Sequence, residues 1–152
     1  CRIDKARFGE IKNVTDRLYY TNSYHVHVCE EIDAFSKLKF ESQFHSISNG
    51  GCISYIEVPD MNKNVEAVED IINFIYHNIQ YAEINTKSDV CYKCGFNGEM
   101  ELDREILTWH CPSCGNDDES ELQVMRRTCG YIGSSYWNKG RTAEIGDRVL
   151  HL

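Results

Sequence analysis

The chain has 152 residues, a formal net charge of −8 and eight cysteines. This length suffices for about one ordinary domain. Its acidic balance argues against nucleic-acid binding, because proteins that bind phosphates carry basic stripes. No signal peptide or membrane span is visible, so the cysteines fit a reducing, cytoplasmic setting better than a secreted one.

The N-terminal part of the chain is predicted to hold loops and short elements. Residues 2–22 are polar with few periodic apolar positions, which indicates loop and a short helix. Residues 23–28 alternate between polar and apolar side chains, which predicts a short strand. His25 and His27 would share one face of that strand, but no third metal ligand accompanies them. We therefore interpret the two histidines as part of a polar strand face.

Two helices and a strand are predicted between residues 33 and 79. A first helix is expected from Asp33 to the stop at residues 49–51, on the spacing of Phe35, Leu38, Phe40, Phe44 and Ile47. The apolar run over residues 52–58 predicts a buried strand. Asn64 can cap a second helix with a core-facing stripe of Val65, Val68, Ile71, Ile72, Ile75 and Ile79. A strand followed by a helix is a β/α unit, consistent with the end of a larger α/β barrel.

Two cysteine motifs follow, at residues 91–95 (CYKCG) and 111–115 (CPSCG), with sixteen residues between Cys94 and Cys111. A CxxC turn brings two thiolates to one side of a tight bend, and the glycine after it lets the backbone turn. Two such turns supply four sulfurs for a tetrahedral metal. The predicted ligands are Cys91, Cys94, Cys111 and Cys114.

The metal at this site is predicted to be structural zinc. Residues 109–115 (WHCPSCG) also resemble the second knuckle of rubredoxin, which holds iron, and four sulfurs suit either metal. The spacing between the two motifs is shorter than rubredoxins use, which favours zinc. A site closed by four thiolates leaves no open position for catalysis. A disulfide framework is the competing interpretation, favoured only in a secreted chain.

The chain after the cysteine motifs is predicted to deliver a glycine loop. Residues 116–120 are an acidic link, and residues 122–125 are expected to form a strand that leads to Gly130. A short helix is expected from Thr142 to Val149.

Residues 127–133 (RTCGYIG) resemble the signature of glycyl-radical enzymes, in which a backbone glycine stores an unpaired electron. The likeness extends to Arg126 before the signature and to residues 137–141 (WNKGR), 144–145, 148–149 and 19–23 (YYTNS) elsewhere in the chain. With the cysteine ribbon in front, the chain resembles the C-terminal part of the large subunit of anaerobic (class III) ribonucleoside-triphosphate reductases. A stretch like residues 19–23 is expected near the site of nucleotide reduction in that family.

The resemblance implies that Gly130 is the catalytic residue that stores the radical, with Arg127, Cys129 and Tyr131 supporting its loop. An α-carbon radical is stabilised by delocalisation into both flanking peptide groups, which needs a flat α-carbon. Any Cβ would clash with those groups, and only glycine lacks one. The loop is expected to be buried close to the centre of a barrel.

The family's chemistry implies further partners. A separate iron–sulfur activating enzyme that uses S-adenosylmethionine would generate the radical. The full enzyme would reduce ribonucleoside triphosphates to deoxyribonucleoside triphosphates, with formate (or, in some members, a thiol system) as the reductant, and would be a homodimer.

The resemblance also implies an order of segments. Residues 1–88 would be the last α/β segment of the reductase barrel, residues 89–118 a zinc ribbon, and residues 119–152 the glycyl-radical loop with a C-terminal tail. The chain starts at Cys1 and not at methionine, so we expect a piece of a longer protein. The substrate-attacking thiyl cysteine of the family is expected to lie outside this chain.

Two interpretations from other classes remain open on the sequence. One is a small rubredoxin-like electron carrier, which would be red with iron. The other is a non-catalytic binding module, in which a zinc ribbon is joined to an α/β scaffold and the glycine loop is inert.

Overall fold

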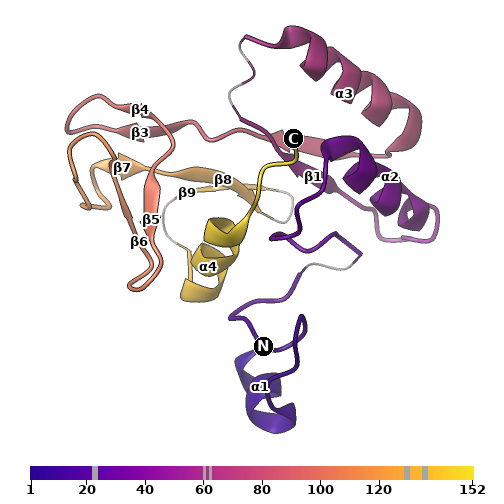
Figure 1. The fold of residues 1–152 in the computed structure, drawn as a ribbon, viewed down its shortest axis with the longest axis horizontal. Coiled ribbons are helices and arrows are strands. Elements are labelled where there is room, and N and C mark those ends of the chain that lie inside the picture. The colour runs from indigo at the N-terminus through magenta and orange to yellow at the C-terminus, as the bar shows by residue number, and fades with distance from the viewer. Residues whose placement is uncertain (22–23, 60, 62, 129–130, 135–136) are drawn as a thin grey trace. The chain divides into compact units, whose positions relative to one another are not determined.

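The structure is a computed structural model that describes residues 1–21, 24–59, 61, 63–128, 131–134 and 137–152 (Figure 1). The described residues form both helices and strands, so the prediction of a mixed α/β fold is confirmed. The first of two compact units comprises Cys1–Asn22, Ser88–Arg126 and Ile132–Asp147. The second unit comprises Ser23–Lys87, Arg127–Tyr131 and Arg148–Leu152. The division into segments 1–88, 89–118 and 119–152 stays a prediction.

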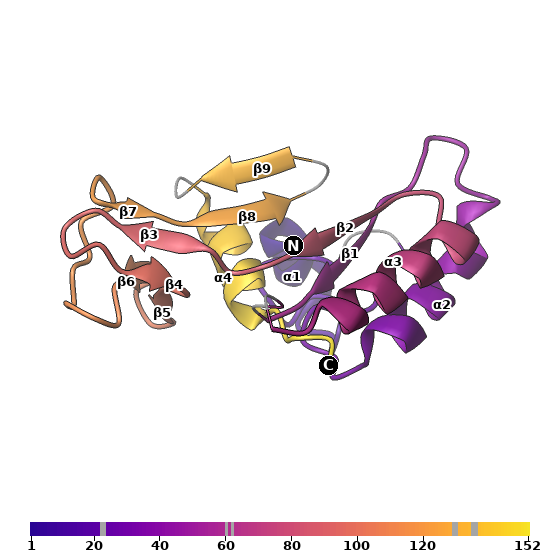
Figure 2. The same cartoon turned by 90° about the horizontal axis from the view of Figure 1, so that it is seen from above.

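A parallel pair of strands, β1 (Ser54–Glu57) and β2 (Ala82–Asn85), is the sheet of the second unit. The helix α3 (Val65–Asn78) connects the two strands, as parallel pairing requires. A further helix, α2 (Ala34–His45), precedes β1 and lies beside α3 (Figure 2). The predicted β/α unit over residues 52–79 is therefore present.

The core of the second unit lies between this strand pair and the two helices. Its buried apolar members are Ala34, Leu38, Ile56, Val58, Ile71 and Ile79, and partly buried residues such as Phe74 and Ile84 pack against them. Since α2 and α3 both contribute to this one cluster, they cover the same apolar face of β1 and β2.

Side-chain caps start both helices where the sequence indicated. The Asp33 carboxylate accepts a hydrogen bond from Ser36 N at 2.9 Å, and the Asn64 amide oxygen accepts one from Ala67 N at 3.3 Å. Each cap satisfies a backbone N–H that has no partner inside its helix. The helix α2 ends at His45, before the glycines that were expected to stop it.

The predicted apolar stripe of α3 is only partly core. Ile71 is buried, whereas Val65 is 69% exposed and Ile72 is 52% exposed. At about 100° per residue, Ile72 is turned well away from Ile71, and it shares its side of the helix with Val65, seven positions earlier. Two of the six residues of the expected stripe, Val65 and Ile72, thus lie on another side of the helix.

The strand predicted over residues 23–28 is wrong for residues 24–28, which form no strand, while Ser23 lies outside the described residues. The backbone of Val26 donates to the Glu41 carboxylate at 3.2 Å, and the His25 ring nitrogen Nε2 lies 2.6 Å from the carbonyl oxygen of Ile53. These partners replace the ladder that an alternating sequence predicts. His27 Nδ1 faces Cys29 Sγ at 3.1 Å, and neither histidine belongs to the metal-binding group found among the described residues.

Short antiparallel strands build the first unit. The strand β3 (Asp89–Cys91) lies between β4 (Asn97–Gly98) and β7 (Leu122–Gln123). A separate hairpin pairs β5 (Glu101–Asp103) with β6 (Thr108–His110). The strands, the segments between them and the C-terminal helix share one apolar core, whose buried members are Cys91, Met100, Trp109, Cys111, Leu122, Val124 and Ile145.

The strand predicted over residues 122–125 is confirmed but interrupted at Val124, after which β8 (Met125–Thr128) begins and pairs with β9 (Tyr131–Ser134). The predicted C-terminal helix is α4 (Lys139–Asp147), which starts earlier than expected because the Asn138 side chain accepts from Arg141 N at 3.0 Å.

The expected short helix at the N-terminus is α1 (Arg2–Phe8). None of the helices formed by the described residues is long and apolar enough to cross a membrane.

Candidate metal centre and glycine loop

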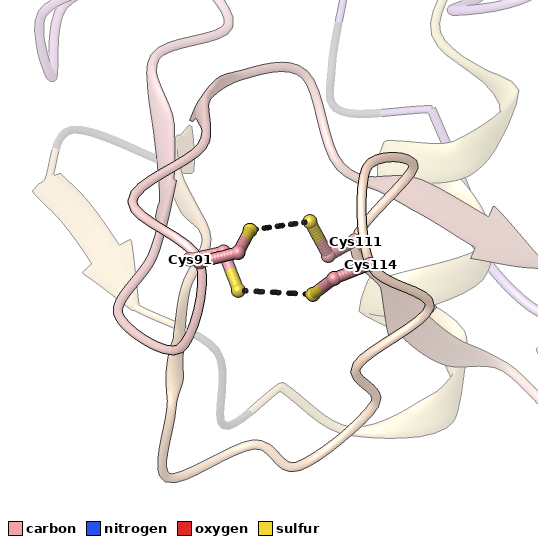
Figure 3. A group of neighbouring side chains, drawn as sticks. Cys91, Cys111 and Cys114 are labelled. Carbon is pink, nitrogen blue, oxygen red and sulfur yellow. Dashed lines mark hydrogen bonds between the residues drawn. The ribbon is translucent and has the colours of Figure 1, made fainter.

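The four predicted cysteines lie together in the first unit. Their sulfur atoms are all within 4.8 Å of one another, in a group made of Cys91, Cys94, Cys111 and Cys114. Figure 3 shows the two CxxC turns facing each other, with the sulfurs of one turn directed at those of the other. Cys91 Sγ lies 3.8 Å from Cys114 Sγ, and Cys94 Sγ lies 3.6 Å from Cys111 Sγ.

These distances fit a tetrahedral metal site. Four sulfurs at about 2.3 Å from a central zinc ion are separated from one another by about 3.8 Å. A disulfide would need a separation of about 2.05 Å, so the facing cysteines are not bridged. The chemistry of four convergent thiols and their spacing therefore suit a thiophilic metal ion.

Tight backbone turns give the cysteines this geometry. Gly95 N donates to the carbonyl of Cys91 at 2.9 Å, and Gly115 N donates to that of Cys111 at 2.8 Å. Both glycines have positive φ, at 76° and 69°, a conformation that other residues rarely adopt. The glycine that follows each CxxC motif is thus required by the turn, as the sequence indicated.

A buried ion pair lies next to the first cysteine motif in the sequence. Asp89, two residues before Cys91, accepts two hydrogen bonds from the guanidinium of Arg126, and the two side chains are 0% and 2% exposed. The same carboxylate accepts from Met100 N at 2.9 Å. The guanidinium also lies over the ring of Trp109, 5.6 Å from its centroid. Asp89 and Arg126 thereby connect β3, which leads into the first cysteine motif, to β8, which follows the second.

Arg127 is held in the second unit. Its Nη1 atom donates to Glu83 at 2.7 Å, and its backbone N–H donates to the Asn85 side-chain oxygen at 3.3 Å. Tyr81 donates its hydroxyl to the same Glu83 oxygen at 2.6 Å. The side chain of Glu83 is 5% exposed and that of Arg127 is 33% exposed.

The other residues of the predicted glycine loop are described only in part. Gly130 and Cys129 lie outside the described residues. Tyr131 is the first residue of β9, and its side chain also lies outside the description. The radical role of Gly130 and the supporting roles of its neighbours stay predictions.

The C-terminal residues attach to the end of β1. Glu57 N donates to His151 Nδ1 at 2.8 Å, and His151 N donates to the carbonyl of Glu57 at 2.9 Å. Arg148 donates to the Glu57 carboxylate at 2.9 Å. Burial, with help from the nearby Lys37 cation, lowers the pKa of His151 to about 4, so its ring is neutral at pH 7.

Nothing in the sequence indicates Asp89, Glu83 and Asn85 as partners of the two arginines before the glycine loop, or Glu57 as a partner of the C-terminal residues. Glu83, Asn85 and Glu57 lie on short strands in which a polar side chain ordinarily faces solvent. Each of these polar residues stands beside an apolar β-branched residue in the sequence, and this pattern is too common in strands to identify a site.

Comparisons with known proteins agree with one another. The family model described as "Anaerobic ribonucleoside-triphosphate reductase" matches residues 1–151. The anaerobic ribonucleoside-triphosphate reductase of Escherichia coli K12 is 43% identical over the whole chain, which corresponds to 22% of that protein. The enzyme of the same name from Haemophilus influenzae is 42% identical over 100% of this chain and 22% of its own. That of phage T4 is 38% identical over 99% of this chain and 25% of its own.

The chain therefore spans a quarter or less of the length of these relatives. The match to the family nevertheless covers nearly every residue, and the identity exceeds 30% throughout. The chain belongs to the anaerobic ribonucleoside-triphosphate reductase family.

Proposed function

We propose that this chain is the radical-storing and metal-binding part of an oxidoreductase that reduces ribonucleoside triphosphates to deoxyribonucleoside triphosphates without oxygen. The observation that carries the proposal is the family match over residues 1–151, in relatives that bear this enzyme's name. The chain would be the C-terminal part of the large subunit, with residues 1–88 completing the reductase barrel.

Gly130 would store the radical. A partner activating enzyme that uses S-adenosylmethionine and an iron–sulfur cluster would take one hydrogen atom from its α-carbon. The glycine radical would then take a hydrogen atom from a cysteine outside residues 1–152, and the resulting thiyl would react with the ribose. Formate would supply the reducing electrons. The loop would be supported by Arg127, Cys129 and Tyr131. The ion pair between Arg127 and Glu83 favours the supporting role of Arg127.

The four cysteines would hold a structural zinc ion in a ribbon over residues 89–118. The sulfur separations of 3.6 Å and 3.8 Å support four-sulfur ligation. With all four positions taken by protein, the ion would stabilise the ribbon and leave the chemistry to the radical. Residues 119–152 would then form the glycine loop and the tail.

The remaining parts of the proposal follow the family. The full enzyme would be a cytoplasmic homodimer that takes part in deoxyribonucleotide synthesis for DNA replication. Its substrate would be a ribonucleoside triphosphate.

The proposal is tested by anaerobic activation of the full-length enzyme with its activating enzyme. Electron paramagnetic resonance should show the doublet of an α-carbon radical coupled to one hydrogen. The variant Gly130→Ala should lack this signal while it keeps the metal content of the wild type. Gly50→Ala is the control, since a Cβ at Gly50 would meet no atom within 4 Å, and it should keep the doublet. A wild-type enzyme that turns over substrate without any such doublet would disprove the assignment.

A further inference from the structure

The parallel pair of β1 and β2 has two chemically different faces. Ile56 and Ile84 are register partners and belong to the apolar cluster under the helices. The next register partners, Glu57 and Asn85, are 5% and 4% exposed. Because side chains alternate along a strand, Glu83 shares the side of Asn85, and it is also buried at 7% exposure.

A buried polar face is unusual for parallel strands, which are normally apolar on both sides. Burial of a carboxylate is costly unless the group is paired and hydrogen-bonded. Here Glu57 is paired with Arg148, Glu83 is paired with Arg127, and Asn85 donates to the Glu57 carboxylate at 2.7 Å. The two carboxylates of this polar face are thus each paired with an arginine, Arg127 or Arg148.

Arg127 is fixed through both its backbone and its side chain. The Asn85 side chain accepts a hydrogen bond from the Arg127 N–H and donates one to the Glu57 carboxylate. The Glu83 carboxylate accepts from the Arg127 guanidinium. Arg127 precedes Gly130 by three positions, a span of about 10 Å in extended chain at most. A residue held at two points so close to the loop restricts where the loop can begin.

We propose that Asn85 and Glu83 are positioning residues for Gly130: by fixing the backbone and side chain of Arg127 on the polar face of β1 and β2, they set where the glycine loop starts. The inference rests on the proposed function of Gly130. Neither residue touches substrate or takes part in hydrogen transfer. Radical transfer depends steeply on the distance and orientation of the reacting groups, so misplacement of the loop lowers its efficiency.

The metal centre offers a way to separate this role from general stability. The cysteines and Asp89 belong to the first unit, whereas Glu83, Asn85 and Arg127 belong to the second. A variant of Asn85 should therefore keep its metal and change the loop.

The experiment compares Asn85→Ala and Glu83→Gln with the wild type in the full-length enzyme. Asn78→Ala is the matched control, because Asn78 is an exposed amide whose side chain donates to Phe74 of its own helix at 2.8 Å. Three quantities are measured: metal per chain, glycyl-radical spins per chain after anaerobic activation, and the rate at which trypsin cuts after Arg127 in the unactivated enzyme.

We expect Asn85→Ala to lower the radical yield about tenfold, equivalent to about 1.4 kcal/mol, at unchanged metal content. Trypsin should cut after Arg127 faster by a similar factor. Glu83→Gln keeps a hydrogen-bond acceptor and should have a smaller effect in the same direction. The control should match the wild type in all three quantities.

Wild-type radical yield and wild-type cleavage in both variants would overturn the inference. If Asn85→Ala loses its metal or does not fold, Glu83→Gln decides alone, and an unchanged yield and unchanged cleavage reject the positioning role. A wild type without any doublet would instead count against the proposed function. Even without a doublet, faster cleavage after Arg127 in the variants would show that Asn85 and Glu83 hold the Arg127 segment in place. Unchanged cleavage in the variants would reject this holding role too.

Discussion

The Asp89 carboxylate and the Arg126 guanidinium form a bidentate ion pair in which both side chains are almost completely buried. Thirty-seven positions separate the two residues in the sequence. The pair joins the strand that leads into the first cysteine motif to the strand that leads toward the glycine loop.

Removal of one partner of this pair should weaken the metal centre. In Asp89→Ala the buried arginine loses its counter-charge, a loss that costs about 3–5 kcal/mol. We expect much faster transfer of the metal to a chromogenic chelator in the full-length enzyme. Arg104→Gln is the control, since it removes an exposed pair with Asp147 that is worth at most about 1 kcal/mol. Equal release rates for the two variants would show that the buried pair does not support the centre.

The metal itself is expected to be one zinc ion per chain. Cys111→Ser should lose the ion, because removal of one of four thiolates opens the tetrahedral site. Cys52→Ser should retain it, since Cys52 lies outside the cysteine group. Metal analysis of the purified proteins measures both outcomes. A red wild-type protein that contains iron would contradict the zinc assignment while leaving the four-sulfur site intact.

Air should cut the activated enzyme at the radical residue. Oxygen adds to a carbon radical, and the chain then breaks at that position. Exposure of the activated enzyme to air should therefore release a C-terminal piece that begins near Gly130, seen by mass spectrometry. Enzyme that was never activated should stay whole under the same exposure. Cleavage elsewhere in the chain would move the radical to another residue.

The attachment of the C-terminal tail should weaken in acid. The pKa of His151 is lowered to about 4 from an ordinary value of 6.5, so the folded state binds the proton less readily than the unfolded state. The stabilisation from the neutral ring is complete above pH 6.5 and is lost as the pH falls toward 4. For this buried ring the loss is on the order of 3 kcal/mol.

Hydrogen exchange of the peptide over residues 148–152, corrected for intrinsic rates, measures this effect between pH 4 and pH 7. Exchange should rise steeply toward pH 4 in the wild type. His151→Gln removes the titrating group and should flatten the profile, whereas His77→Gln, at an exposed site on α3, should not. A profile that stays steep in His151→Gln would assign the pH dependence to another group.

The parts of the fold that the sequence predicts are those coded by neighbouring residues. The caps at Asp33 and Asn64, and the turns at Gly95 and Gly115, each depend on a few adjacent positions, and all are present. The strand predicted from the alternating side chains at residues 24–28 does not form, because the backbone there bonds to tertiary partners such as Glu41 and not to a neighbouring strand.

The polar contacts around the candidate site could not be predicted in this way. Glu83 and Arg127 are 44 positions apart, and nothing local to either residue indicates the other. The four cysteines are an exception among distant residues, because one metal ion needs all four and the CxxC spacing therefore carries the information.

The metal centre has one protected side and one vulnerable side. Cys91 and Cys111 are buried, whereas Cys94 and Cys114, the second cysteine of each turn, are exposed. Oxidants and alkylating reagents reach the outer pair first, so damage would begin with two thiolates and leave the inner pair to hold the ion for a time. In the proposed oxygen-independent enzyme such an arrangement could persist, because the conditions that would oxidise the outer sulfurs are also those that would destroy the proposed radical.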